Sequence, residues 1–221
     1  KYQNALDILG SLSQYKNISN IERAKLYMLE GKVLFAMKGC DDSVRRAYQR
    51  ALDTVPDDPN IKAQATLAKS RVMISCGDED DWKSSKKLLN LIKDRYATEV
   101  RINLALVHLL LKEYDDALKK YDHVINEIES RKYCDSSIYI SAYIGKGLCY
   151  ALSNNGEMME AIKCFRNLLS LYPESKKIFL GIFLDQKDEQ IQFKKYSELL
   201  KNVEDKQNYD YNTFIERIKG Y

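Results

Sequence analysis

The stretch 100–124 reads VRINLALVHLLLKEYDDALKKYDHV. Apolar residues recur in it at helical spacing on both sides of the short polar segment 112–114, and alternation with a period of two is absent. The stretch therefore predicts two helices joined by a tight turn. Similar apolar segments separated by short polar clusters fill the rest of the sequence, which predicts about eleven or twelve helices in all.

Glycine and proline are scarce, with nine Gly and three Pro among 221 residues. The turns of β-sandwiches, barrels and βα units use these residues at roughly twice this combined rate. The composition therefore argues against an all-β fold and against a glycine-rich nucleotide site. No apolar run approaches the ~20 residues of a membrane span, so we expect no membrane partner. The net charge of +3 is too small to indicate a nucleic-acid partner by itself.

Internal repeats account for the helical pattern. In the stretch 100–124, the small Ala105 lies on the first helix, Tyr114 at the turn, and Ala117 and Tyr121 on the second helix. This order resembles a tetratricopeptide repeat, in which small residues let two helices approach and aromatic residues fill the space between successive hairpins. Three other segments match different parts of the same pattern, through Tyr27, Gly31, Leu34, Tyr48, Ala51 and Pro56, through Leu67, Ala68, Leu88, Leu89 and Ile92, and through Tyr143, Gly147, Tyr150, Gly156, Ala161, Phe165, Leu168 and Pro173.

The resemblance implies an all-α fold, an α-solenoid in which helix-turn-helix repeats stack into a right-handed superhelix. We predict about four repeats, over residues 20–57, 58–96, 97–131 and 134–173. Residues 1–15 resemble the second helix of a truncated preceding repeat, and residues 174–221 a degenerate repeat with a C-terminal capping helix. We therefore expect the sequence to be a piece of a longer protein, with an apolar end near Leu6 and Leu9 that is available for self-association.

Residues suited to catalysis are few. The two histidines, His108 and His123, fall inside predicted helices, and we expect His108 to lie in the core or on a groove wall. The sequence has no HExxH, GxSxG, P-loop or GxGxxG motif, and Gly145 and Gly147 lie inside a predicted helix, where they serve close packing. We therefore predict that the chain is not an enzyme and has no catalytic residue and no cofactor.

The cysteines stand at positions 40, 76, 134, 149 and 164, so they are odd in number and widely spaced. This pattern favours reduced, buried thiols in the cytoplasm or the nucleus over a disulfide framework. Cys40 and Cys76 stand near the ends of corresponding first helices and are placed to approach one another across neighbouring repeats. For this pair, too, we favour buried thiols over a bond.

Metal sites are also disfavoured by the sequence. No CxxC pair is present, and a structural zinc site needs four converging ligands. The acidic turn 78–81 lacks the Gly and the distal Glu of a calcium loop. We expect it to be a solvated turn, in which Asp80 or Asp81 caps the helix that begins near Trp82.

In tetratricopeptide solenoids the first helices line the concave surface, so the resemblance implies that a partner binds there. Lys25 and Lys62 are predicted at equivalent positions of successive repeats, as are Lys32 and Lys69, which makes the amino-terminal part of the groove basic and the remainder apolar. Such a groove suits an extended or helical peptide with acidic and apolar residues. The predicted partner-binding residues are Lys25, Met28, Lys32, Phe35, Lys62, Lys69, Val72, Asn103, Leu106, Leu109, Ser141, Ile144 and Leu148.

These observations favour a non-catalytic scaffold or adaptor segment of a larger multi-subunit assembly, which binds a partner protein in the concave groove. Chaperone adaptors of this family bind a terminal carboxylate through Lys-x3-Asn and Lys-x3-Arg pairs. These pairs are absent at Lys32 and Lys69, because the residues four positions on are Ala36 and Met73. A regulatory or targeting segment of a larger enzyme is the alternative. A solenoid that binds single-stranded RNA is less favoured, since the 16 tyrosines do not alternate with arginine.

Overall fold

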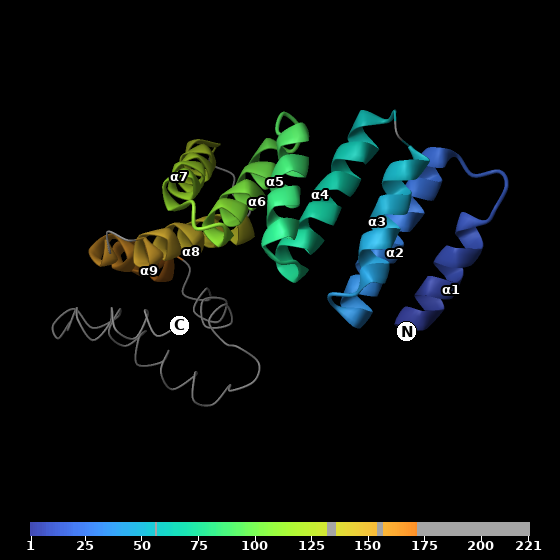
Figure 1. Ribbon diagram of the computed structural model, residues 1–221, viewed down its shortest axis with the longest axis horizontal. Helices are drawn as coiled ribbons and strands as arrows, with labels where there is room; N and C mark the ends of the chain where they lie inside the picture. Colours follow the sequence, from blue (N-terminus) through green and yellow to red (C-terminus); the bar gives the residue numbers. More distant parts are fainter. Residues whose placement is uncertain (56, 132–135, 154–156, 172–221) are drawn as a thin grey trace. The chain divides into compact units, whose positions relative to one another are not determined.

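The computed structural model describes residues 1–55, 57–131, 136–153 and 157–171 (Figure 1). This part of the chain holds nine α-helices and no strand, so the predicted all-α fold is confirmed. None of these helices is long and apolar enough to cross a membrane. The helices predicted within 174–221 lie outside the described residues. The nine helices are α1 (Tyr2–Ser13), α2 (Asn20–Lys38), α3 (Asp42–Thr54), α4 (Pro59–Cys76), α5 (Glu79–Leu91), α6 (Ala97–Leu110), α7 (Tyr114–Arg131), α8 (Ser136–Leu152) and α9 (Met158–Leu171).

The chain divides into two compact units, Lys1–Leu111 and Lys112–Tyr221. The first unit contains α1 to α6, and the second contains α7 to α9. The division falls between α6 and α7, within the predicted repeat 97–131. The predicted repeat boundaries stay predictions.

In the first unit, helices that follow one another in the chain pack side by side, from α1 to α6 (Figure 1). Helices α2 and α4 also contact each other, as do α4 and α6. The unit is thus a row of hairpins in which α2 and α4 are the first helices of successive hairpins. Each hairpin buries its apolar side chains against its neighbours, as stacked repeats do.

An apolar cluster joins the first hairpin to α4. Leu34 of α2 and Val44 and Tyr48 of α3 pack there against Val72 of α4. A methyl group at Gly31 would lie 2.8 Å from the Tyr48 ring, so glycine lets this ring approach the axis of α2. The predicted close approach at Gly31, with Tyr48 filling the space, is confirmed.

The acidic turn before α5 caps that helix, but through a different residue from the ones expected. The Asp78 carboxylate accepts hydrogen bonds from the backbone N–H groups of Asp80 and Asp81. The prediction that Asp80 or Asp81 is the cap is wrong, because α5 begins at Glu79 and not near Trp82. Asp81 is thereby left inside the first turn of α5, where its carboxylate can reach a neighbouring helix.

In the second unit, α8 packs against both α7 and α9. A methyl group at Gly145 would lie 2.1 Å from the Tyr121 ring of α7, and one at Gly147 would lie 2.4 Å from the Phe165 ring of α9. Both glycines therefore let an aromatic ring of a neighbouring helix approach the axis of α8. Their predicted role in close packing is confirmed.

Candidate functional site

One side of α2 is exposed along the length of the helix. Its exposed residues Ile21, Lys25, Leu29 and Lys32 recur at the spacing of one helix face, and Phe35 continues that face toward the end of α2. The apolar members are well exposed for their type, with 40% of Ile21, 47% of Leu29 and 39% of Phe35 accessible. These five residues, the α2 face, thus alternate apolar and basic side chains.

The exposed residues of α4 form a second face. Asn60, Gln64, Arg71 and Ser75 recur at the same helical spacing, and these four residues are the α4 face. This face is polar throughout, and Arg71 carries its one charge. Two amide side chains, Asn60 and Gln64, lie toward the beginning of the helix.

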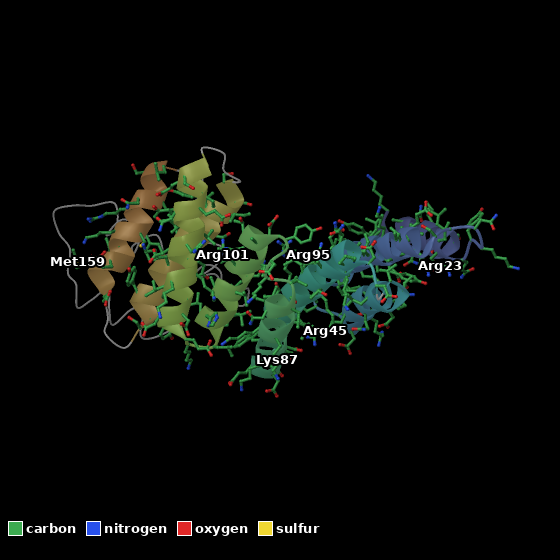
Figure 2. All side chains as sticks on the ribbon, turned by 90° about the horizontal axis from the view of Figure 1, so that it is seen from above. Arg23, Arg45, Lys87, Arg95, Arg101 and Met159 are labelled. Atoms are coloured by element: carbon green, nitrogen blue, oxygen red, sulfur yellow. A yellow bond between two sulfur atoms is a disulfide. The ribbon has the colours of Figure 1, made fainter. Side chains whose placement is uncertain are left out.

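Hydrogen bonds tie the beginning of the α4 face to the turn before α6. Arg95, labelled in Figure 2, donates from Nη1 to Asn60 Oδ1 at 2.5 Å. Gln64 Nε2 donates to the Tyr96 hydroxyl at 2.7 Å. The two amides are therefore engaged within the fold, and Arg71 is the residue of this face best placed to bind a charged partner.

Tyr48 of α3 is buried and packs against both α2 and α4. Its ring contacts Gly31, which adjoins Lys32 on α2. Burial raises the pKa of the Tyr48 hydroxyl, and the Arg71 guanidinium of α4 opposes part of this rise. Because α2 and α4 pack together and both lie close to this one side chain, we consider the α2 face and the α4 face together as the first-helix surface.

The register of α4 differs from the predicted one. The sequence pattern predicts Ala68 as the small residue at which α4 closely approaches its partner helix, as Gly31 does in α2. The structure gives this role to Ser70, which is fully buried and whose carbonyl accepts a hydrogen bond from Ser85 Oγ of α5. Both residues are small, so the pattern alone did not separate them.

The shifted register removes two lysines from the first-helix surface. Lys69 is half-buried, and its Nζ donates to Gln49 Oε1 of α3 at 2.6 Å. Lys62 is exposed and lies two helical turns before Lys69 on the same side of α4. The predicted equivalence of these lysines with those of α2 is therefore wrong, and Gln64 and Arg71 stand in their places.

The hairpin of α8 and α9 shows the small-to-aromatic contact that the repeat pattern predicts. Gly147 of α8 faces Phe165 of α9, and Ala161 and Leu168 of α9 are buried. The family model for the tetratricopeptide repeat matches residues 141–175. The chain contains a tetratricopeptide repeat. No curated protein matches the chain.

Two thiols lie buried in this tetratricopeptide repeat, Cys149 on α8 and Cys164 on α9. Burial raises the pKa of Cys149 to about 12 and that of Cys164 to about 11. Both are therefore protonated at neutral pH, which makes them poor nucleophiles and poor metal ligands. The prediction of buried thiols is confirmed for these two, while Cys134 lies outside the described residues.

The structure separates the predicted partner-binding residues into exposed and buried ones. Val72 is a core residue that packs with Leu34 and Val44, so its predicted place on an open surface is wrong. Leu109 and Ile144 are also buried, at 8% and 2% accessible, and present no surface to a partner. Half-buried are Met28, Lys69, Asn103 and Leu148, and exposed are Lys25, Lys32, Phe35, Lys62, Leu106 and Ser141.

The sequence pattern missed Ile21 and Leu29 of the α2 face and all four residues of the α4 face. Arg71 was the available signal for α4, because it stands where tetratricopeptide repeats usually place an aromatic or apolar residue. A charged side chain at such a position indicates that the helix is rotated relative to the family pattern. That rotation brings the four missed residues of α4 onto its exposed face.

Helix α1 exposes a different apolar face from the one expected. Leu9 is buried, and Leu6 packs against the cluster between α2 and α3. Helix α1 does expose apolar side chains in this region, as predicted, but Leu6 and Leu9 are not among them, because they already face the first hairpin. The exposed apolar side chains are Tyr2, Ile8 and Leu12, at 51%, 59% and 42%. Self-association through α1 stays a prediction.

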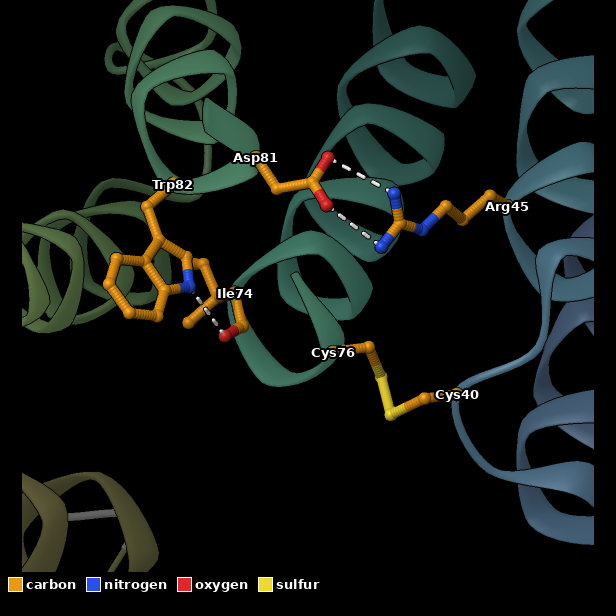
Figure 3. Close-up of a disulfide and its surroundings, with 6 residues drawn as sticks. All are labelled: Cys40, Arg45, Ile74, Cys76, Asp81 and Trp82. Atoms are coloured by element: carbon orange, nitrogen blue, oxygen red, sulfur yellow. Dashed lines mark hydrogen bonds and ion pairs between the residues drawn. A yellow bond between two sulfur atoms is a disulfide. The ribbon is translucent and has the colours of Figure 1, made fainter. Parts of the chain in front are cut away.

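Cys40 and Cys76 form a disulfide, with their Cα atoms 5.2 Å apart (Figure 3). The predicted approach of the two residues is confirmed, but the prediction of buried thiols is wrong for this pair. Cys40 is exposed and Cys76 is half-buried. They lie at the same end of successive hairpins, where the Cα separation suits a disulfide bond.

His108 is buried on α6, in agreement with its predicted place in the core. His123 is exposed on α7. Within the part of the chain that the structure describes, no group of His, Cys, Asp and Glu is arranged to hold a metal ion.

Proposed function

We propose that the chain is a non-catalytic adaptor that binds an acidic, amphipathic peptide or helix of a partner protein on the first-helix surface. Tetratricopeptide repeats bind proteins in general, and the chain contains one. We further propose that it works as a segment of a larger multi-subunit assembly.

The observation that carries the proposal is the alternation of basic and apolar side chains along α2, next to a further cation on α4. Lys25 and Lys32 flank Leu29 on α2, and the exposed Phe35 follows them. Helical peptides bind such surfaces through apolar anchors at helical spacing, with charges that fix their orientation. The Arg71 guanidinium on the α4 face suits a carboxylate in particular, because its planar donors match the two oxygens.

Helix α2 also carries two carboxylates, and Glu22 interacts electrostatically with Lys25 of the α2 face. Glu22 accepts hydrogen bonds from the backbone N–H and the hydroxyl of Ser19 in the cap of α2. Glu30 pairs with Arg50 of α3 at 2.5 Å. Glu22 therefore offsets part of the charge of Lys25, and Lys32 together with Arg71 supplies the basic character of the first-helix surface.

A synthetic amphipathic helix with glutamate and leucine along one side is the probe that tests the proposal. Its binding to the full chain is measured by fluorescence anisotropy at low and high salt. Lys32→Glu with Arg71→Glu should weaken binding by about tenfold or more and reduce the salt dependence, because two attractive charges become repulsive. Lys62→Glu with Lys87→Glu is the matched control, since it also reverses two exposed charges, one on the other side of α4 and one on α5.

Equal losses in the control and in the double variant would show that the net charge of the chain, and not the first-helix surface, attracts the probe. The proposal is also rejected if the wild-type chain does not bind the probe even at low salt.

A further inference from the structure

A covalent bond and an ion pair join two hairpins at one end of the first unit. Cys40 lies in the turn between α2 and α3, and Cys76 is the last residue of α4. Arg45 in the first turns of α3 forms a two-pronged ion pair with Asp81 of α5, at 3.0 and 2.9 Å (Figure 3). The two hairpins are thus linked by a disulfide, which a reductant can break, and by an ion pair, which a reductant does not affect.

The local backbone fixes the position of Cys40. Gly39 has φ 63° and ψ −126°, a conformation that side chains disfavour, and its N–H donates to the Phe35 carbonyl at the end of α2. Asp41, which follows Cys40, accepts a hydrogen bond from the Ser43 backbone N–H and caps α3. Cys40 is therefore held between two helix ends rather than in a loose loop.

The disulfide differs from the buried thiols of the second unit in its accessibility. Cys40 is exposed, whereas Cys149 and Cys164 are buried. An incoming thiolate must reach a disulfide sulfur for exchange to occur, so exposure favours reduction of this bond. The pair is therefore the site in the described part of the chain at which a reductant can act.

The bond lies beside the ends of both faces of the first-helix surface. Phe35, the last member of the α2 face, accepts the hydrogen bond from Gly39 through its carbonyl, and Ser75 of the α4 face immediately precedes Cys76. Arg71 lies about one helical turn before Ser75, so the covalent link limits how far this cation can move from the apolar ring of Phe35. Holding a binding surface in one geometry lowers the entropy that a partner must remove on binding.

We propose that the Cys40–Cys76 disulfide is a redox-operated clamp, which holds α4 against the turn between α2 and α3 and is released by a dithiol reductant of the thioredoxin class. Its effect on partner binding rests on the function proposed above. Its effect on the two hairpins does not, and the two effects are measured separately.

The exchange proceeds in two balanced steps. A thiolate of the reductant attacks Cys40 Sγ, the bond between the two cysteine sulfurs breaks, and Cys76 leaves as a thiolate that takes up a proton. The second thiol of the reductant then attacks the reductant's first sulfur, which is bonded to Cys40 in the mixed disulfide. This step releases Cys40 as a thiol and closes a disulfide within the reductant. Two electrons pass from the dithiol to the cystine, and the reductant ends as a disulfide.

Hydrogen exchange of the full chain, oxidised and then reduced with dithiothreitol without denaturant, tests the clamp. Peptides that cover residues 35–46 and 70–80 should exchange about tenfold faster after reduction, while peptides of α8 and α9 should not change. Iodoacetamide added after reduction should label Cys40 and Cys76, with Cys149 and Cys164 unlabelled, as read by peptide mapping.

Cys40→Ser with Cys76→Ser is the matched variant. It should exchange like the reduced wild type and should not respond to dithiothreitol. The clamp is refuted if iodoacetamide labels both cysteines of the wild type before reduction, if the bond is reduced only in denaturant, or if reduction leaves exchange of both peptides unchanged.

Binding of the glutamate–leucine probe to the oxidised and reduced chain measures the functional effect. We expect about three- to tenfold weaker binding after reduction. If the oxidised and reduced chains bind the probe with equal affinity while reduction speeds hydrogen exchange, the disulfide restrains the two hairpins but does not control binding. Absence of probe binding in both states would instead refute the proposed function, while the exchange result would still decide whether the clamp exists.

Discussion

Removal of the Cys40–Cys76 disulfide should lower the stability of the first unit by an amount that depends on the length of the loop that the bond closes. The bond closes a loop with a sequence separation of 36 residues. In the chain-entropy account, a crosslink of this span restricts the unfolded chain by about 4 kcal/mol at room temperature, and measured effects are typically about 2–4 kcal/mol. The Arg45–Asp81 ion pair and the cluster around Val72 remain, so we expect the hairpins to stay folded.

Urea unfolding followed by tryptophan fluorescence measures this change. Trp82 is the one tryptophan of the sequence and lies on α5, where its Nε1 donates to the Ile74 carbonyl near the end of α4. The fluorescence transition therefore reports on α5 and on the end of α4, which the disulfide joins to the turn between α2 and α3. Cys40→Ser with Cys76→Ser should lower the free energy of unfolding of the oxidised chain by about 2–4 kcal/mol.

Two controls separate the bond from the loss of the sulfur atoms. Reduction of the wild type should reproduce the stability of the double variant, and reduction of the double variant should have no effect. Cys149→Ser, in the second unit, should leave the response of Trp82 to reductant unchanged. The reasoning is refuted if the oxidised wild type and the double variant unfold within about 0.5 kcal/mol of each other, because the bond would then not restrict the unfolded chain.

Two further predictions concern packing and self-association. Gly145→Ala should lower the stability of the second unit by about 1–3 kcal/mol in thermal unfolding, because the new methyl group would lie 2.1 Å from the buried Tyr121 ring. Ser141→Ala, at an exposed position of the same helix, is its control, and equal effects would show that the ring moves away without cost. If α1 mediates self-association, Ile8→Glu with Leu12→Glu should lower the concentration-dependent increase in sedimentation coefficient, whereas a wild type that stays monomeric at high concentration would contradict that prediction.

The fold was predictable because each helix carries its own apolar spacing and each turn its own polar cluster. Contacts between specific residues were predictable where the residue types leave one arrangement. Gly31 with Tyr48, and Gly147 with Phe165, are such pairs, since at these two positions a methyl group would already lie too close to the ring.

The surface was less predictable, because it depends on the rotation of α4. Ala68 and Ser70 are both small, and the choice between them decides whether Lys69 or Arg71 faces a partner. The burial of Ser70 against α5 settles that choice through a packing contact between helices. A single sequence shows how the residues are spaced. It does not show which of two small residues packs against the neighbouring helix.

The disulfide, too, could be predicted only in part from the sequence. The spacing of Cys40 and Cys76 places them at the same end of successive hairpins, and this much was predicted. Whether their Cα atoms come within bonding reach depends on the conformation of Gly39 and on how closely α4 packs against the first hairpin. Those are properties of the assembled unit.

If α2 and α4 present one surface of basic and apolar side chains, partner binding should depend on Arg71 and not on Lys62. The most direct measurement compares Arg71→Glu with Lys62→Glu in the anisotropy assay with the glutamate–leucine helix, at one salt concentration and with the disulfide intact. The two variants change the same charge on the same helix, on opposite sides. Selective loss of binding in Arg71→Glu is the predicted result, and a loss in Lys62→Glu that equals or exceeds it would contradict the account.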